Sequence, residues 1–127
     1  MILFLMKSLC WFVNRDNSAQ GLIQGWNRSI GFDIEETAPF SIEVRDGQVS
    51  LQAGKYEKAD LVIRTTKENF QRVLKGEFQF EEAFIRKKFE AIGPVHDAAK
   101  FKRMIGLVFE SNKMLIKSFR FTVGRFL

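Results

Sequence analysis

The stretch Ala59–Pro94 constrains the fold of this 127-residue chain most, because strand and helix periodicities follow one another within it. In residues 59–64 every second side chain, starting with the first, belongs to one apolar face, which predicts a half-buried strand. Thr65 and Glu68 have the spacing of a capping box, in which each side chain binds a free backbone N–H, and they predict a helix start. Gly76 predicts the end of that helix, because glycine adopts the left-handed conformation at the least cost.

Two groups of apolar residues in the same stretch have the i, i+3, i+4 spacing of one helix face: Phe70, Val73 and Leu74, then Phe80, Ala83 and Phe84. They predict a helix followed by a second, short helix. Phe89 and Ala91 begin a further strand, and Gly93-Pro94 ends it. The predicted order is therefore strand, helix, short helix, strand.

Three more strands are predicted upstream, where apolar and polar residues alternate in 32–35, 40–45 and 49–53. Asp46-Gly47, between the last two, is a strong signal for a two-residue hairpin. Together with the strands that begin near residues 59 and 89, this makes five strands in a mostly antiparallel sheet. Each strand has one apolar face, so helices must cover that side of the sheet.

Two longer helices are predicted outside the central stretch. One begins near Ser18 and has an apolar stripe: Ala19, Leu22, Ile23 and Trp26. The other follows Pro94, with Asp97 as a cap, and carries a second stripe: Ala98, Phe101, Ile105 and Val108. The tail 112–127 mixes apolar and basic residues, and its spacing fits a strand or an extended helix equally well.

Residues 1–13, MILFLMKSLCWFV, are apolar apart from Lys7 and Ser8. The segment is too short for a membrane span, which needs about 20 residues. It also lacks the basic start and small-residue cleavage site of a signal peptide. Two readings stay open: a helix packed on the domain, or a segment that touches a membrane or joins two copies of the chain.

The order and spacing of the central stretch resemble the sterol carrier protein type 2 (SCP2) lipid-transfer domain family. That family has an Ala-Asp that opens a strand, a helix ending in Gly, an Ala-Phe in a short helix and a Leu-x-Ile-x-Gly strand. The corresponding residues here are Ala59-Asp60, Gly76, Ala83-Phe84 and Phe89-x-Ala91-x-Gly93. The likeness covers most of the chain after Ser18.

The resemblance implies an α/β (α+β) fold, with a five-stranded, mostly antiparallel sheet covered by helices in a single domain, 1–127. Residues 1–17 would be an apolar extension and 112–127 a basic and apolar tail. Two departures affect the short helix. Gln79-Phe80 replace the Asp-Pro with which the family often starts it, and Lys87 replaces the Gly that commonly ends it, so Lys87 either adopts a left-handed conformation or the helix ends differently.

In the SCP2 family the helices leave an apolar tunnel above the sheet, which holds fatty-acyl or sterol ligands. The resemblance implies such a tunnel here, lined by Phe70, Val73, Leu74, Phe80, Phe84, Phe89, Phe101 and Ile105. The predicted function is noncatalytic binding of a fatty-acyl, sterol-like or isoprenoid lipid, with transfer left open. The alternatives are an interaction or scaffold module whose cavity is filled, and a basic nucleic-acid-binding protein.

Residues that could carry catalysis are few. His96 is the only histidine, and its neighbour Asp97 points elsewhere on a helix or turn. Glu81-Glu82 favour a helix start through the helix dipole, and Cys10 has no nearby histidine to activate it. No phosphate-binding loop or metal-ligand spacing is present in the sequence. We therefore expect no enzymatic activity, no metal and no cofactor.

Charge and cysteine content bear on partners and compartment. The net charge is +5, and basic residues dominate after Asp97. Such a basic tail, interleaved with apolar residues, suits an anionic membrane surface as well as simple solvation. No base-stacking motif is visible, so we expect no specific nucleic acid. A single cysteine excludes an intrachain disulfide and favours a reducing, cytoplasmic location.

Overall fold

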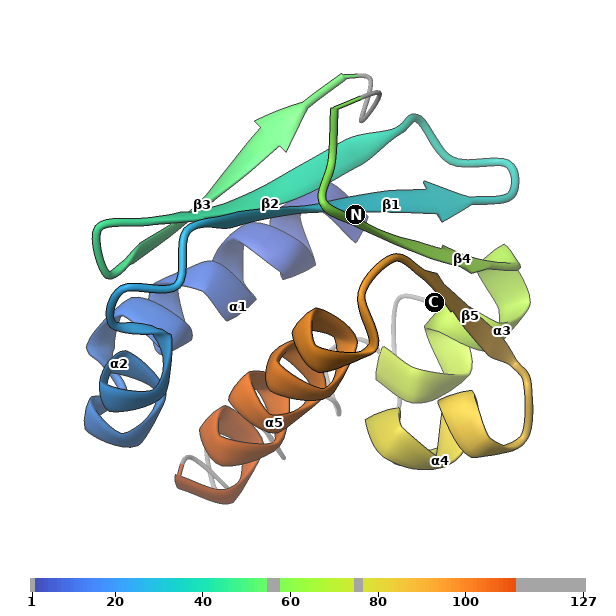
Figure 1. The fold of residues 1–127 in the computed structure, drawn as a ribbon. Coiled ribbons are helices and arrows are strands. Elements are labelled where there is room, and N and C mark those ends of the chain that lie inside the picture. The colour runs from blue at the N-terminus through green and yellow to red at the C-terminus, as the bar shows by residue number, and fades with distance from the viewer. Residues whose placement is uncertain (1, 55–57, 75–76, 112–127) are drawn as a thin grey trace.

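The computed structural model of the protein describes residues 2–54, 58–74 and 77–111 (Figure 1). The side chains of Leu5, Leu74, Phe80, Glu81 and Phe109 are outside this description, although their backbones are inside it. The predictions for Gly76 and for the tail 112–127 concern residues outside the described ranges.

Five strands form one mixed sheet with the order β3-β2-β1-β4-β5. The strands are β1 (Arg28–Ile34), β2 (Phe40–Arg45), β3 (Gln48–Ala53), β4 (Leu61–Thr65) and β5 (Phe89–Ile92). The β1–β4 pair is parallel and the other three neighbouring pairs are antiparallel. The prediction of five mostly antiparallel strands is confirmed.

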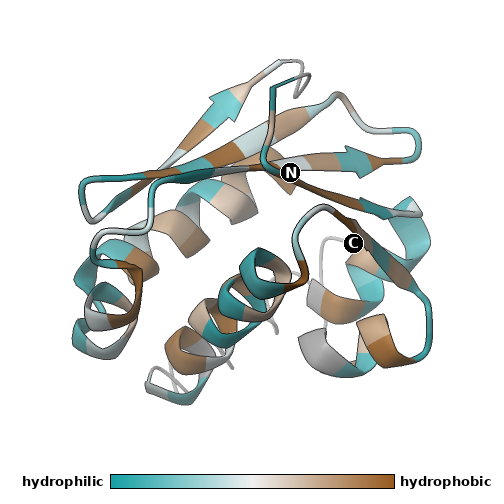
Figure 2. Cartoon of the chain, in the orientation of Figure 1, coloured by the Kyte–Doolittle hydropathy of each residue, from teal (hydrophilic) through white to brown (hydrophobic). Residues whose placement is uncertain are grey.

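The described helices all lie on one face of this sheet (Figure 1). They are α1 (Ile2–Arg15), α2 (Asn17–Ile23), α3 (Lys67–Leu74), α4 (Phe80–Ile85) and α5 (Val95–Ser111). Figure 2 shows hydrophobic and hydrophilic residues on the strands above the helical layer. The buried core includes alternate residues of β1, β2 and β4: Ile30, Phe32, Ile34, Phe40, Ile42, Val44, Leu61 and Ile63. The opposite face of the sheet is mainly polar, with Asp33 paired to Arg64 at 3.0 Å. One face of the sheet therefore holds the apolar interior.

The hairpin between β2 and β3 has the predicted turn. Asp46 and Gly47 both have positive φ, 52° and 77°, which is the requirement of a type I′ turn. This turn fixes the register in which Val44 lies opposite Val49.

The cap of α3 is one residue later than predicted. Thr66, not Thr65, accepts the hydrogen bond from the Asn69 backbone N–H, at 3.1 Å. Thr65 is still the last residue of β4, so its side chain is buried and its hydroxyl donates to the Lys88 carbonyl at 2.8 Å. Strand pairing continues through Thr65 on both sides, and this pairing removes it from the capping position.

Helix α2 begins within one residue of the predicted start near Ser18, but it ends at Ile23, before Trp26 of the predicted stripe. Asp16 caps α2 by accepting from the Ala19 N–H at 2.8 Å, so this helix starts at Asn17. Trp26 lies beyond its end, after Gly25 has turned the chain with φ 76°. Trp26 is nevertheless buried, because it packs between the start of β1 and α5.

Helix α1 is packed on the domain. Its core-facing residues are one turn apart and buried: Ile2, Met6, Cys10 and Val13. Its last turn is bound to the edge strand β3 by the Asn14 side chain. The Asn14 amide donates to the Val49 carbonyl at 2.8 Å and accepts from the Val49 N–H at 2.7 Å. The helix is therefore held both by apolar burial and by two directional bonds.

Candidate functional site

The interior beneath β1 and β2 is built around the Phe32 ring. Phe32 stacks on Phe40 across the antiparallel pair, with ring centroids 4.9 Å apart and an interplanar angle of 8°. Phe70 of α3 and Phe101 of α5 each meet Phe32 edge-on, at 6.3 and 6.0 Å. Residues from two strands and two helices thus meet at one point of the apolar face.

The row of rings continues toward α4. Phe70 lies 6.1 Å from Phe89 of β5, and Phe89 lies 5.5 Å from Phe84 of α4 in an edge-to-face arrangement. Phe84 is half-buried, whereas Phe70 and Phe89 are buried. We call Phe32, Phe40, Phe70, Phe84, Phe89 and Phe101 the ring cluster. It crosses the interior from the β1–β2 pair to α4.

The ring cluster brings together four of the eight residues predicted to line a tunnel: Phe70, Phe84, Phe89 and Phe101. Val73 and Ile105 are buried in the same core. Leu74 and Phe80 belong to α3 and α4, but their side chains are outside the described set. Phe32 and Phe40 were not in the predicted set, although their position on the buried face of two predicted strands was available in the sequence.

The segment that joins α4 to β5 connects two members of the ring cluster, Phe84 and Phe89. Lys87 has φ 60° and therefore adopts the left-handed conformation that the missing glycine would have taken at less cost. The next carbonyl, that of Lys88, accepts from the Thr65 hydroxyl at 2.8 Å and from the Asn69 amide at 3.4 Å. These bonds set the position of Phe89 relative to α3.

Helix α4 itself is weakly terminated. Gln79 occupies its N-cap position, and its side chain makes no capping hydrogen bond. With six residues, α4 is also shorter than the length at which a helix is stable by itself. Its position therefore depends on contacts of its apolar side, including the half-buried Phe84.

Gly93 fixes the corner between β5 and α5. Its φ is 143°, and a Cβ at this position would lie 2.7 Å from the Asp60 carbonyl oxygen and 3.2 Å from Leu61. Only glycine fits such a contact. Because α5 starts two residues later, this close approach also determines where Phe101 enters the ring cluster.

A buried carboxylate connects α5 to the start of β1. Asp97 accepts from Trp26 Nε1 and from Arg28 Nε, both at 3.0 Å. The prediction that Asp97 caps α5 is wrong: it is the third residue of the helix and is bound by side chains far away in sequence. Burial alone would raise the pKa of Asp97, but the bonds from Trp26 and Arg28 and the charges of Arg28 and His96 outweigh it and lower the pKa.

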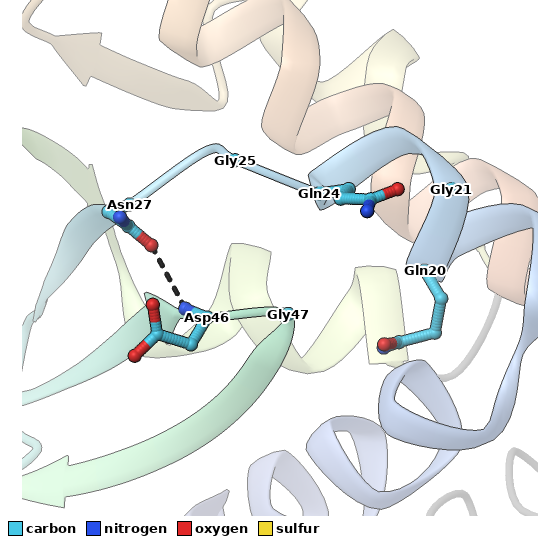
Figure 3. Close-up of a pocket in the computed structure, with 7 residues that line it drawn as sticks. All are labelled: Gln20, Gly21, Gln24, Gly25, Asn27, Asp46 and Gly47. Atoms are coloured by element: carbon cyan, nitrogen blue, oxygen red, sulfur yellow. Dashed lines mark hydrogen bonds between the residues drawn. The ribbon is translucent and has the colours of Figure 1, made fainter.

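Three of the surface hollows are lined by described residues. The largest of these three has a volume of about 480 Å³ and lies between α2 and the β2–β3 turn (Figure 3). It is lined by Gln20, Gly21, Gln24, Gly25, Asn27, Asp46 and Gly47. A second, of about 340 Å³, lies beside Ile2 and Lys67, and a third, of about 380 Å³, lies on α1. The eight predicted lining residues border none of these three.

The structure places His96, Glu82 and Cys10, three of the residues weighed for catalysis in the sequence. His96 is exposed at the start of α5, and Glu82 pairs with Arg86 one turn later at 3.0 Å. Burial raises the pKa of the Cys10 thiol to about 11, which keeps it protonated and unreactive at neutral pH. Within residues 2–54, 58–74 and 77–111, no three acidic, histidine or cysteine residues are grouped as a metal site would require.

In the part of the chain that the structure describes, none of the helices combines the length and the apolar character that a bilayer span needs.

The chain matches the model of the SCP-2 sterol transfer family over residues 7–106. This match begins within α1, earlier than the sequence motifs suggested. No curated protein sequence matches the chain. Among solved structures, sterol carrier protein domain 2 of Helicoverpa armigera has a TM-score of 0.65 at 17% identity, covering 81% of this chain and 84% of that chain.

Two other solved structures contain the same fold, one in a protein of similar length and one as part of a much longer chain. UbiJ-SCP2, a ubiquinone synthesis protein, has a TM-score of 0.60 at 14% identity and covers 81% of this chain and 87% of that chain. The sec-alkylsulfatase Pisa1 from Pseudomonas sp. has a TM-score of 0.54 at 17% identity and covers 69% of this chain. The chain spans 14% of the sulfatase's own length. At these identities the likeness is one of fold.

Proposed function

The chain belongs to the SCP-2 sterol transfer family, and on that premise we propose that it binds a long apolar lipid between the sheet and helices α3, α4 and α5. The ligand class is fatty-acyl, sterol-like or isoprenoid. The protein acts as a noncatalytic carrier, which takes up the lipid, shields it from water and releases it unchanged.

One observation supports this proposal above others: the ring cluster is a continuous row of contacting apolar side chains that extends from the buried Phe32 to the half-buried Phe84. Phenyl rings bring apolar area without a hydroxyl that needs a partner. A lipid chain that replaces some of the ring-to-ring contacts would therefore leave no polar group unsatisfied.

The affinity of such a site comes from burial of the ligand rather than from directed bonds. Each methylene that leaves water contributes about 0.8 kcal/mol. A long acyl chain or an isoprenoid therefore binds without a hydrogen bond, and the site selects for length and width rather than for a headgroup. Release follows when the lipid finds an equally apolar environment elsewhere.

Access is proposed to occur beside α4. This helix has no side-chain cap, and Phe84 is the member of the ring cluster that reaches the surface. Lys102 of α5 lies with its Nζ 5.1 Å from the Phe84 ring centre, so a cation borders the same edge. An acidic headgroup would be tolerated at this rim while the chain enters.

The test is uptake of stearate labelled with an environment-sensitive fluorophore. Phe84→Trp enlarges the side chain at the proposed entrance and should reduce uptake about tenfold or more, since one added ring volume blocks a packed site. Ile85→Trp is the matched control, because Ile85 is the next residue of the same helix and is 80% exposed. Equal uptake by the wild type and both variants would remove Phe84 from the path.

Direct ring-to-ring contacts also favour a second candidate, an interaction module whose interior is filled by its own side chains. Mass spectrometry of organic extracts from the purified protein distinguishes the two. Co-purified lipid supports the carrier, whereas a clean extract together with no stearate uptake supports the filled module.

A further inference from the structure

The hollow between α2 and the β2–β3 turn is polar, and it shares no residue with the ring cluster. Figure 3 shows one side of it formed by the end of α2 and the segment that follows, and the other side by the Asp46-Gly47 turn. Its volume of about 480 Å³ lies within the range of about 300–1,000 Å³ that is usual for small-molecule sites. Its lining consists of glycines, amide side chains and one carboxylate, so it suits a small polar molecule rather than a lipid.

The charge in this hollow is negative, although the chain as a whole has a net charge of +5. Asp46 is the only ionisable residue in the lining, and its carboxylate makes no ion pair within the described part of the chain. Two basic residues flank the lining in sequence, but both are bound to other carboxylates. Arg45 pairs with Glu43 at 2.6 Å, and Arg28 pairs with Asp97 at 3.0 Å. The Asp46 carboxylate is therefore available to a cation.

The Gln20 side chain presents a fixed acceptor to the same hollow. Its Nε2 donates to the Val13 carbonyl at 3.0 Å, and this bond determines which end of the amide stays free. Its Oε1 faces the β2–β3 turn, since a Cβ on Gly47 would lie 3.7 Å from it. In Figure 3, Asp46 and Gln20 lie at opposite ends of the hollow.

Two further amides border the space between these ends. Asn27 Oδ1 accepts from the Asp46 backbone N–H at 3.0 Å, which leaves the Asn27 Nδ2 group as a donor. Gln24, the C-cap residue of α2, is exposed and offers both a donor and an acceptor. A hydroxyl group is also both a donor and an acceptor, so amides of this kind match a hydroxylated ligand.

Gly21 keeps part of the hollow unfilled. It lies inside α2, where glycine is less favourable than every residue except proline. A Cβ at this position would meet no atom within 4 Å, and Gly21 does not have positive φ, so neither packing nor backbone conformation requires glycine here. By contrast, Gly25 and Gly47 have φ values of 76° and 77°. We expect a larger side chain at position 21 to occupy space that a ligand would need.

We propose that this hollow binds a small molecule that carries a primary ammonium group and hydroxyl groups, such as an amino sugar. The ammonium group pairs with the Asp46 carboxylate at one end. The hydroxyl groups bind the amides of Gln20, Gln24 and Asn27. A small anion would be repelled by Asp46, and a divalent metal ion requires more oxygen ligands than this single carboxylate and the separated amides provide. The site is separate from the ring cluster, so it does not rest on lipid binding.

The experiment is a titration of the isotope-labelled full chain with glucosamine, followed through the backbone amide signals of Gly21, Gly25 and Gly47. These signals should shift with a dissociation constant on the order of 1 mM, since an ion pair exposed to water adds little affinity. Glucose, which has the same ring without the ammonium group, should bind about fivefold more weakly. Asp46→Asn should bind both sugars alike, and it keeps the turn because Asn-Gly is favoured in type I′ turns.

Gly21→Leu tests the position of the ligand. It should weaken glucosamine binding about tenfold or more, because the added side chain fills the hollow. Gly106→Leu is the matched control, since Gly106 lies in α5, has no atom within 4 Å of an added Cβ and does not border the hollow. Both variants should raise the midpoint of thermal unfolding, so weaker binding by the first would not reflect unfolding. Glu110→Gln, which removes an exposed carboxylate elsewhere, should bind as the wild type does.

The proposal is overturned if the three glycine signals do not move at tens of millimolar glucosamine, or if the wild type binds glucose and glucosamine equally well. Unchanged binding by Gly21→Leu would also overturn it, because the ligand would then lie elsewhere. Two other occupants would replace the proposed one. Calcium chloride that shifts these signals at a lower concentration than glucosamine would indicate a metal site, and an oligolysine peptide that shifts them when glucosamine does not would indicate a basic protein segment.

Discussion

The helices on the two sides of the helical layer pack on the sheet through different kinds of contact. On one side, α1 and the start of α5 are held by directional bonds in addition to apolar burial: Asn14 to Val49, and Trp26 and Arg28 to Asp97. On the other side, α3 and α4 are held mainly by the ring cluster, together with the left-handed Lys87.

This difference suggests that the two sides have different roles, one rigid and one able to adapt to a ligand. Hydrogen bonds weaken steeply when distance or angle changes, so the first side tolerates little movement. Ring contacts are individually weak and can be exchanged for contacts with another apolar molecule. We therefore expect the second side to be the one that adapts to a ligand, and the following predictions test the comparison.

The largest expected effect is that of Phe101→Ala, which removes a buried ring from the cluster. The free energy of unfolding should fall by about 3–5 kcal/mol, measured by urea denaturation. Saturating lipid should recover part of this loss, because binding to the folded state adds stability. A loss of less than about 1 kcal/mol would mean that the ring is not an integral part of the core.

Asp97→Asn should cost about 2 kcal/mol, because Arg28 loses its charged partner and the buried Trp26 keeps a poorer one. Since the pKa of Asp97 is lowered in the folded state, its contribution is fully present above its ordinary value of 3.8 and is lost as pH falls below it. The difference between wild type and variant should be constant near neutral pH and shrink in acid. A difference that grows in acid would contradict the lowered pKa.

Asn14→Ala should cost about 1–2 kcal/mol, because the Val49 N–H and carbonyl lose their partner at a half-buried position. Lipid uptake should be unchanged, in contrast to the variants of the ring cluster. Hydrogen exchange of the Val49 amide measures the local effect. If uptake falls along with stability, the two sides are coupled more closely than their contacts indicate.

The smallest effect is expected from Lys87→Gly, which should stabilise the protein by about 1 kcal/mol by relieving a left-handed lysine. Thermal unfolding measures it, and Lys88→Gly is the control, since Lys88 does not have positive φ. A destabilised Lys87→Gly variant would mean that the lysine side chain contributes more than its backbone costs.

The sequence was most informative where apolar residues recur with the period of a strand or of a helix. The strands, the Asp46-Gly47 turn and the apolar stripe of α5 follow from alternation and helical spacing, because burial on one face imposes those periods. Thr65 was predicted as the cap in place of Thr66, because both threonines precede the same helix and only strand pairing distinguishes them.

The residues whose roles were not predicted have partners that lie far away in sequence. Asp97 looks like a cap, yet it binds Trp26, 71 positions earlier. Phe32 and Phe40 are predicted strand residues outside the predicted lining, because that lining was inferred from residues 70–105 and left out the two upstream strands. The alternation placed both rings on a buried face, but their contacts with Phe70 and Phe101 follow only from the topology, which places β1 beside β4.

The Asn14 amide has one more consequence, for the behaviour of the protein at high concentration. The outermost strand of a sheet offers unpaired backbone groups on which a strand from another molecule can grow into fibrils. At Val49 of β3 both groups are already occupied by a side chain of the same molecule. The two bonds that hold α1 in place thus also remove one site at which a strand of another molecule could pair.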